Sequence, residues 1–161
     1  MSLMSEATPA TRALSRLGVA FRVHHYRVDE RRDVSYGEAV AAALGVDPPR
    51  VFKTLVALVD GEPVVAIVPV VSVMSLKRLA KAAGGKRAAM AATRDAERLT
   101  GYVVGGISPF GRRRRLRVFC DRSVVGFDTV FVSGGRRGIQ LEVSPDDLVR
   151  VTEAVLADLA A

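Results

Sequence analysis

Residues 51–71 read VFKTLVALVDGEPVVAIVPVV, two valine-rich apolar runs separated by Asp60-Gly61. Runs of this length on either side of an Asp-Gly pair predict a β-hairpin. Because both faces of each run are apolar, we expect the two strands to be buried on both sides and central in a sheet. Helices and further strands must then cover this hairpin and extend its sheet.

Cap residues and hydrophobic spacing predict the elements around the hairpin. The expected helices cover residues 9–17, 36–44, 76–83, 94–99 and 145–159, and the expected strands cover residues 21–26, 115–120, 129–133 and 139–143. Thr93 is the expected cap of the fourth helix, and the last helix is expected to bury a stripe from Val149 through Leu156 to Leu159. The pattern indicates a single α+β domain over residues 8–161, with one mixed β-sheet covered by helices.

The composition of the 161 residues excludes several classes of protein. Apolar residues make up 49% and charged residues 25%, as in an ordinary globular domain rather than a disordered or collagen-like chain. The longest uncharged stretch, residues 63–76, is too short for a membrane-spanning helix. Residues 1–10 lack the apolar core of a secretory signal. Residues 1–7 are expected to be a disordered tail, with Met1-Ser2-Leu3 ahead of Met4 as a cloning remnant.

Net charge and cysteine usage indicate the kind of partner and the compartment. Lys and Arg number 24 against 17 Asp and Glu, a formal net charge of +7. This excess favours a polyanionic partner, nucleic acid first, although an arginine-rich composition can also reflect the genome. Cys120 is the only cysteine, so no intrachain disulfide can form. We therefore expect a protein of the reducing cytoplasm.

Lys53 is the one charged residue in the first strand of the hairpin. An ammonium group on a central strand must form an ion pair, lose its proton or point into a cleft, because burying it unpaired is costly. Alternatively, it lies at the mouth of the strand and extends its amine to water. The strand by itself favours this second interpretation.

Two glycine-rich segments are candidate binding loops: VVGGISPFG at residues 103–111 and VSGGRRG at residues 132–138. Adjacent glycines allow backbone N–H groups to approach an anion or a polarised carbonyl. Neither segment has the spacing of a Walker loop or a dinucleotide fingerprint, and tight turns explain both at least as well. Arginines 112–115 follow the first loop, either as a solvated charged face or as contacts to a phosphate backbone.

Other side chains give weaker signals. His24 and His25 would point to opposite faces of a strand, and no Cys or carboxylate stands at ligand spacing, so no metal site is expected. Cys120 lacks a catalytic signature and fits a buried hydrophobic position. No Ser-His-Asp order or carboxylate pair stands out, so a standard hydrolytic triad is not supported.

Four motifs occur in one order: FRVHHY at residues 21–26, VFKTL at 51–55, TGYVVGGISP at 100–109 and VSGGRRG at 132–138. Together they closely resemble the YbaK/EbsC family of freestanding aminoacyl-tRNA deacylases, relatives of the editing domain inserted in bacterial prolyl-tRNA synthetases. The resemblance runs from about Thr8 to the end of the chain. It implies the YbaK-like fold, an α+β domain whose mixed sheet is partly barrel-like. Within the family, the pattern is similar to the Cys-tRNA(Pro) deacylase branch.

The resemblance implies a trans-editing enzyme that removes cysteine mischarged onto the proline tRNA. Such a second site is needed because pocket size alone discriminates poorly between small side chains. In this branch the thiol of the substrate attacks its own ester carbonyl, expels the tRNA and leaves a cyclic thiolactone. The enzyme then supplies neither a nucleophile nor activated water, and no cofactor or metal is implied. The partner is the aminoacylated tRNA(Pro), and docking on prolyl-tRNA synthetase stays open.

The family motifs place the site residues on this sequence. Lys53 corresponds to the essential lysine of the family, which we assign to the phosphate or ribose of the terminal adenosine and to holding the ester. Gly105, with Gly106 beside it, corresponds to the backbone next to the ester carbonyl. The expected substrate-binding residues are Tyr26, Thr54, Ile107, Ser108, Pro109, Ser133 and Gly134, and the expected tRNA-binding residues are Arg112, Arg113, Arg114, Arg115, Arg136 and Arg137.

Two positions depart from the family pattern. Val28 stands where relatives often carry a histidine, so no proton transfer is expected there, and Gln140 stands where some members carry an acidic residue. The amino acid removed therefore stays open between cysteine and alanine or others. A non-catalytic tRNA- or nucleotide-binding module and a hydrolase of small esters are the alternatives. Loss of activity in Lys53→Ala argues against the first, and a steep salt dependence against the second.

Overall fold

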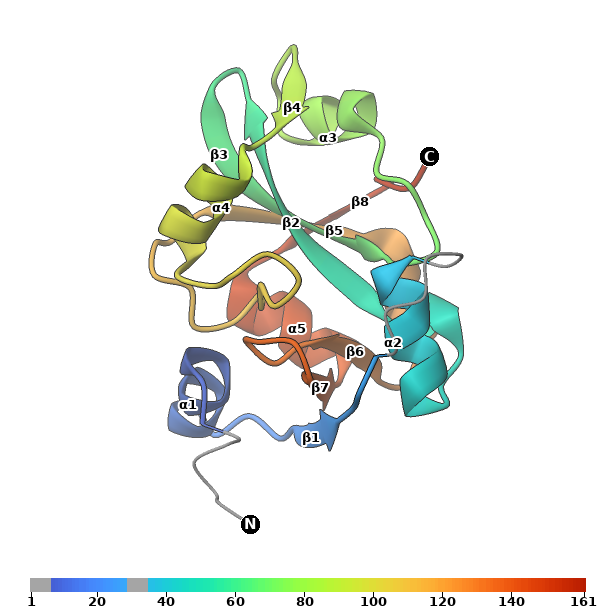
Figure 1. Ribbon diagram of the computed structural model, residues 1–161. Helices are drawn as coiled ribbons and strands as arrows, with labels where there is room; N and C mark the ends of the chain where they lie inside the picture. The colour runs from blue at the N-terminus through green and yellow to red at the C-terminus, as the bar shows by residue number, and fades with distance from the viewer. Residues whose placement is uncertain (1–6, 29–34) are drawn as a thin grey trace.

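The computed structural model describes residues 7–28 and 35–161 (Figure 1). The strands in these ranges are β1 (Arg22–His25), β2 (Phe52–Val59), β3 (Glu62–Pro69), β4 (Ala88–Met90), β5 (Arg117–Asp121), β6 (Val130–Ser133), β7 (Ile139–Val143) and β8 (Val155–Ala157). The α-helices are α1 (Pro9–Arg16), α2 (Tyr36–Leu44), α3 (Leu76–Ala82), α4 (Thr93–Thr100) and α5 (Pro145–Thr152). Within the same ranges, no helix is both long and apolar enough to cross a membrane. Residues 1–6 of the expected disordered tail lie outside the described residues.

The described strands form two sheets, one in the order β4-β2-β3-β5-β8 and the other in the order β1-β7-β6. β3 pairs antiparallel with β2 and parallel with β5, so the larger sheet is mixed, as expected. The smaller sheet is antiparallel and replaces part of the single sheet that the sequence predicts. An isolated parallel bridge between Val51 and Phe131 joins the two. Both sheets stay open within the described residues, so the α+β fold contains no closed barrel.

The hairpin of β2 and β3 is confirmed, and both strands lie inside the larger sheet. Asp60 and Gly61 have φ angles of 49° and 84°, the left-handed pair that a two-residue hairpin turn requires. The Asp60 carboxylate accepts hydrogen bonds from the backbone N–H groups of Lys86 and Arg87, which lower its pKa. These bonds hold the turn against the chain that leads into β4.

The end of the chain differs from the helix expected over residues 145–159. α5 begins as expected but ends at Thr152, where Glu153 follows with a φ of 55°. Residues Val155–Ala157 then form β8, because the open edge of β5 offers backbone groups that a parallel strand can satisfy. The predicted helical stripe is therefore wrong beyond Thr152: Leu159 is buried, but it packs from an extended segment.

Three clusters of buried side chains hold these layers together. The largest lies between the two sheets and includes residues of α1, α4 and α5. The second packs α3 against the opposite face of the larger sheet, and the third lies beneath α2. The smaller sheet turns Ile139 and Leu141 toward the largest cluster, so the alternation of side chains places Ser133 and Gln140 on its other face. That polar face borders the candidate site.

Candidate functional site

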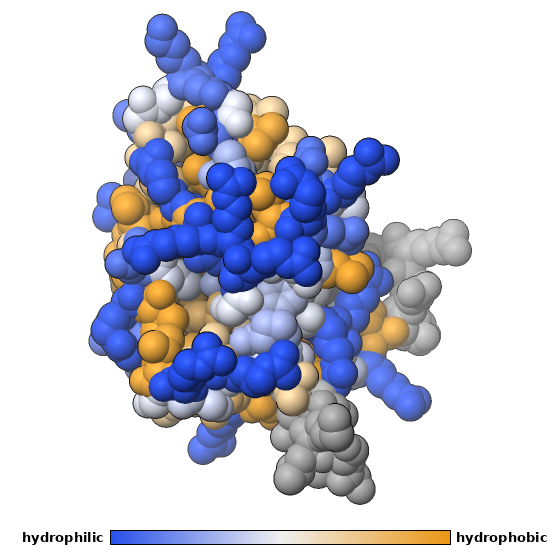
Figure 2. All heavy atoms as spheres, turned by 90° about the vertical axis from the view of Figure 1, so that its left-hand side faces the viewer, coloured by the Kyte–Doolittle hydropathy of each residue, from blue (hydrophilic) through white to orange (hydrophobic). Residues whose placement is uncertain are grey.

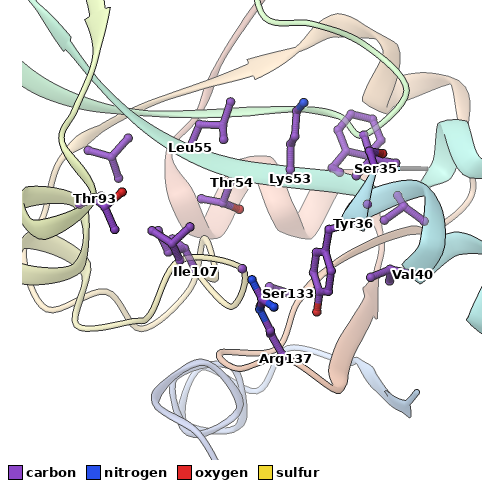
Figure 3. Close-up of a pocket in the computed structure, with 18 of the residues that line it drawn as sticks. Ser35, Tyr36, Val40, Lys53, Thr54, Leu55, Thr93, Ile107, Ser133 and Arg137 are labelled. Atoms are coloured by element: carbon purple, nitrogen blue, oxygen red, sulfur yellow. The ribbon is translucent and has the colours of Figure 1, made fainter. Parts of the chain in front are cut away.

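A cavity of about 450 Å³ opens where the two sheets meet (Figure 3). Its walls come from β2, the start of α2, the loop between α4 and β5, and the facing ends of β6 and β7. Cavities of this size bind small organic groups. The polar side chains that line it are Ser35, Tyr36, Lys53, Thr54, Thr93, Ser133, Arg137 and Gln140.

The bridge between Val51 and Phe131 explains why these distant segments meet. The two chains run in the same direction there, so Lys53 and Ser133, each two residues further on, both reach the cavity. Ser133 is in turn the cross-strand partner of Gln140, and such partners carry their side chains on one face. The cavity therefore lies beside β2 and the polar face of the smaller sheet, and consecutive residues from both faces of β2 line it.

Lys53 is half-buried in the wall of the cavity and forms no ion pair with any described residue. Burial lowers the pKa of its amine, since desolvation disfavours the charged form. Lys53 and Leu55 point to one face of β2, and Thr54 points to the other (Figure 3). Among the described residues no carboxylate lines the cavity, so Lys53 and Arg137 give it an excess of positive charge.

Thr54 and Gln140 are buried polar side chains in opposite walls, 7% and 5% exposed. Neither the hydroxyl of Thr54 nor the amide oxygen of Gln140 has a hydrogen-bond partner within the described part of the chain. The Ser133 hydroxyl accepts a bond from the Gly135 N–H at 3.1 Å and keeps its own hydrogen available. The cavity thus contains polar groups whose hydrogen-bonding capacity the fold leaves unused.

Tyr36 is a cavity residue that the sequence does not single out, because residues 35–38 show only the pattern of a helix cap. The cap is present, since the Ser35 hydroxyl accepts a bond from the Glu38 N–H. It leaves Tyr36 at the cavity, where the guanidinium of Arg137 lies over its ring, 4.6 Å from the centroid. No local signal separates such a tyrosine from an ordinary helix-start residue.

The expected substrate-binding residue Tyr26 reaches the site through Tyr36 rather than directly. It is not among the lining residues, but the two tyrosine hydroxyls share a hydrogen bond of 2.8 Å. Burial, together with this bond, raises the pKa of Tyr36, so its phenol stays protonated. Tyr26 therefore supports the ring on which Arg137 lies.

The two glycine-rich loops pack against each other. A Cβ on Gly106 would lie 2.6 Å from the Cα of Arg136, and one on Gly105 would collide with the Arg137 guanidinium. The Gly106 N–H already donates to the carbonyl of Val103. Close packing between loops thus explains the glycines, and only Gly105, at a φ of 93°, lines the cavity.

The remaining loop residues divide between the cavity and the core. Ile107 lines the cavity, whereas Ser108 and Pro109 are buried outside it, and the Ser108 hydroxyl accepts a bond from the Phe110 N–H. Gly134 lies outside it too: its carbonyl accepts a bond from the Thr8 hydroxyl at 2.6 Å. These three expected substrate-binding residues build the loops that shape the site.

Exposed arginines gather on the face formed by α1, α4 and the loop between α4 and β5, where Figure 2 shows projecting hydrophilic side chains. Arg113 and Arg114 belong to this face, and neither forms an ion pair within the described residues. Arg136 is also exposed, beside the cavity residue Arg137. These four side chains are available to a polyanion.

Arg112 and Arg115 are partly engaged within the fold. Arg112 is half-buried, donates from Nε to the Pro109 carbonyl, and has its pKa lowered mainly by burial. Arg115 forms an exposed ion pair with Glu153. They are therefore weaker candidates for contact with a polyanion than Arg113 and Arg114.

The remaining expectations concern a metal site, single side chains and one helix cap. Within the described ranges, no three His, Cys, Asp or Glu side chains are arranged to hold a metal. His24 bonds Glu142 at 2.9 Å, and Val28 packs beneath α2. Thr93 is not the helix cap, because Ala92 occupies that position and Thr93 begins α4. Cys120 is a free cysteine buried in the larger sheet, so its thiol is not exposed.

Comparisons with known proteins find relatives of this chain by sequence and by fold. Residues 32–151 match the family described as the aminoacyl-tRNA editing domain. The Enterococcus faecalis protein named "Putative Cys-tRNA(Pro)/Cys-tRNA(Cys) deacylase EbsC" is 33% identical over 155 residues, 96% of this chain and 93% of that protein. The "Multifunctional Ser/Thr-tRNA deacylase ProXp-y" of Escherichia coli K12 is 29% identical over 138 residues, 83% of either chain. The fold matches a structure described as "a putative trans-editing enzyme for prolyl tRNA synthetase", with a TM-score of 0.87 and 24% identity over 99% of both chains.

Proposed function

Since the chain belongs to the aminoacyl-tRNA editing family, we propose that it is a trans-editing deacylase that removes cysteine mischarged onto tRNA(Pro). The observation that carries this proposal is the make-up of the cavity. Lys53 and Arg137 supply positive charge, while no carboxylate, histidine or cysteine lines it within the described residues. Such a site binds an anionic substrate but lacks a nucleophile–base pair of its own.

A cysteinyl ester supplies the missing nucleophile itself. Its Sγ forms a bond to the ester carbonyl carbon, the bond from that carbon to the ribose oxygen breaks, and the thiol proton passes to the ribose oxygen. The products are a cyclic thiolactone and deacylated tRNA, and no water is consumed. The positive charge of Lys53 and Arg137 favours the thiolate and the developing oxyanion over their neutral forms.

The remaining site residues hold the substrate in the reactive geometry. We assign Lys53 to the phosphate or ribose of the terminal adenosine, and the backbone of Gly105 to the neighbourhood of the ester carbonyl. Arg113, Arg114 and Arg136 are assigned to the phosphate backbone of the tRNA, where sequence-independent contacts fix its position. The cellular partner is then aminoacyl-tRNA in the cytoplasm, with prolyl-tRNA synthetase as the enzyme whose errors are corrected.

The proposal is tested by deacylation of Cys-, Ala- and Pro-tRNA(Pro) with the wild type, Lys53→Ala and the exposed-lysine control Lys81→Ala. We expect rapid loss of cysteine alone, slowed about 100- to 1,000-fold in Lys53→Ala, as when one group that stabilises a transition state is removed. Lys81→Ala should match the wild type, and circular dichroism should show that all three proteins are folded. Methylating the thiol of the substrate should abolish clearance.

The same assay separates the alternatives. Clearance of alanine instead of cysteine keeps the family and overturns the substrate. Clearance of none of the three, with tRNA still bound, leaves a binding module. Because contacts to phosphates release counterions, kcat/KM should fall steeply with salt, and less steeply in Arg113→Ala and Arg114→Ala. A kcat/KM that does not depend on salt, together with cleavage of free cysteine esters, would identify a small-molecule hydrolase.

A further inference from the structure

Thr54 and Gln140 are the buried side chains, within the described residues, whose polar atoms lack any hydrogen-bond partner. Both line the same cavity, and they come from different sheets, β2 and β7. Buried polar groups are almost always paired, so two unpaired ones in one cavity need an explanation. A bound ligand that supplies the missing partner is such an explanation.

The chemistry of the pair limits what that partner is. The Gln140 oxygen is an acceptor only, and the Thr54 hydroxyl accepts as well as donates, so together they suit a ligand with an O–H, S–H or N–H donor. A charged ammonium is a poor fit, because Lys53 and Arg137 are cationic and no carboxylate of the described chain lines the cavity. The ligand group should therefore be a neutral donor.

We infer that Thr54 and Gln140 select the side chain of the aminoacyl group, favouring one with a hydroxyl or thiol over an apolar one of similar size. This inference rests on the proposed deacylase function. Every aminoacyl ester carries an α-amine, so only a side-chain donor distinguishes cysteine or serine from alanine or proline. A site with buried hydrogen-bonding groups disfavours a substrate that leaves them unpaired.

Ser133 adds a hydrogen-bond donor beside Thr54 and Gln140. It is the cross-strand partner of Gln140, so the two side chains lie on one face of the smaller sheet. Its oxygen already accepts the Gly135 N–H, which leaves it as a donor toward the lone pairs of a ligand oxygen or sulfur. A hydroxyl or thiol both donates and accepts, whereas a methyl group does neither.

Serine and alanine esters on the same tRNA give the cleanest test, because neither carries a thiol that could react by itself. As competitors of Cys-tRNA(Pro) clearance by the wild type, Ser-tRNA(Pro) should have an inhibition constant at least about tenfold below that of Ala-tRNA(Pro). Thr54→Val and Gln140→Met, which keep size but remove the polar groups, should each lower this preference about tenfold by weakening inhibition by the serine ester only. Thr54→Ser keeps a hydroxyl that donates and accepts and should preserve it.

Thr152→Val is the matched control, since Thr152 is also 7% exposed but lies on α5, where its hydroxyl donates to the Leu148 carbonyl. It should leave the preference unchanged. Equal inhibition by the serine and alanine esters in the wild type, or an equal weakening of both in the variants, overturns the selection role while the deacylase stands. Clearance of no aminoacyl-tRNA at all overturns the proposed function, and the selection role with it.

Discussion

Asp121 and Thr54 are buried to nearly the same degree, 6% and 7% exposed, yet the fold treats them in opposite ways. Asp121, at the end of β5, accepts four hydrogen bonds: one oxygen takes the N–H groups of Leu159 and Ala160, and the other takes the N–H and hydroxyl of Ser123. Thr54, in the cavity, has no partner within the described residues. Burial alone therefore does not distinguish a polar group that the fold satisfies from one that it leaves unpaired.

The difference lies in whether the fold completes the hydrogen bonds. At Asp121 every bond is made within the chain, and the result ties the segment after β8 to the end of β5. At the cavity, Thr54 and Gln140 are held in place by their strands but left unpaired. A buried unpaired group costs stability, and the selection role proposed above gives these two a use beyond folding.

The largest effect on stability is expected from Asp121→Ala. The substitution leaves the N–H groups of Leu159 and Ala160 without their acceptor, and we expect a loss of about 2–4 kcal/mol in the free energy of unfolding. Urea denaturation measures it. Asp158→Ala, which removes only an exposed ion pair with Arg122, should cost less than about 1 kcal/mol. Equal losses in the two variants would contradict the role given to Asp121.

The acid dependence of stability should change in Asp121→Asn. Burial raises the pKa of Asp121, but the hydrogen bonds from Ser123, Leu159 and Ala160 outweigh it and set the pKa below the ordinary 3.8. A carboxyl whose pKa is lower in the folded state stabilises the fold fully above its unfolded pKa, and this contribution is lost as the pH falls through the folded pKa. Urea midpoints between about pH 2 and 6 should therefore fall less steeply for Asp121→Asn than for the wild type. Parallel curves would show that Asp121 is not the group responsible.

Thr54→Val should change stability in the opposite direction. The variant removes an unpaired buried hydroxyl and keeps the shape of the side chain, so we expect the ligand-free protein to gain about 1 kcal/mol. In the control Thr152→Val, the hydroxyl lost is one that donates to the Leu148 carbonyl at 2.7 Å, and stability should fall slightly. Urea midpoints decide: a loss in Thr54→Val as large as in Thr152→Val would mean that the Thr54 hydroxyl is satisfied in the folded protein.

The difference between local and long-range interactions explains how much of the fold could be predicted from the sequence. The hairpin turn at Asp60-Gly61 and the cap at Ser35 depend on neighbouring residues, and both were predictable because the signals are local. The bridge of Val51 to Phe131 joins segments far apart in the chain, so the division into two sheets was not predictable from neighbouring residues. The sequence predicts helix where β8 lies, since its apolar spacing suits a helical face and only the open edge of β5 decides against it.

The same distinction between local and long-range information applies to the candidate site. Family motifs predicted Lys53, Thr54, Gly105, Ser133 and Arg137, and the structure brings them to one cavity. The cavity position of Tyr36 and the unpaired state of the Gln140 amide depend on how α2 and β7 face β2. Neither property is carried by the residues next to them in the sequence.

Cys120 should give the smallest effect on activity. It neighbours Asp121 in β5, and burial raises the pKa of its thiol to about 12, so at neutral pH it holds its proton and is a poor nucleophile. Cys120→Ala should lower the free energy of unfolding by about 1 kcal/mol through lost packing but leave kcat/KM for Cys-tRNA(Pro) within about twofold. Iodoacetamide should fail to label the native wild type. Rapid labelling, or a tenfold loss of activity in Cys120→Ala, would place a reactive thiol in the protein and remove the reason for assigning the attack to the substrate. An unlabelled and dispensable Cys120 would instead leave the cysteine of the substrate as the only thiol available for the reaction.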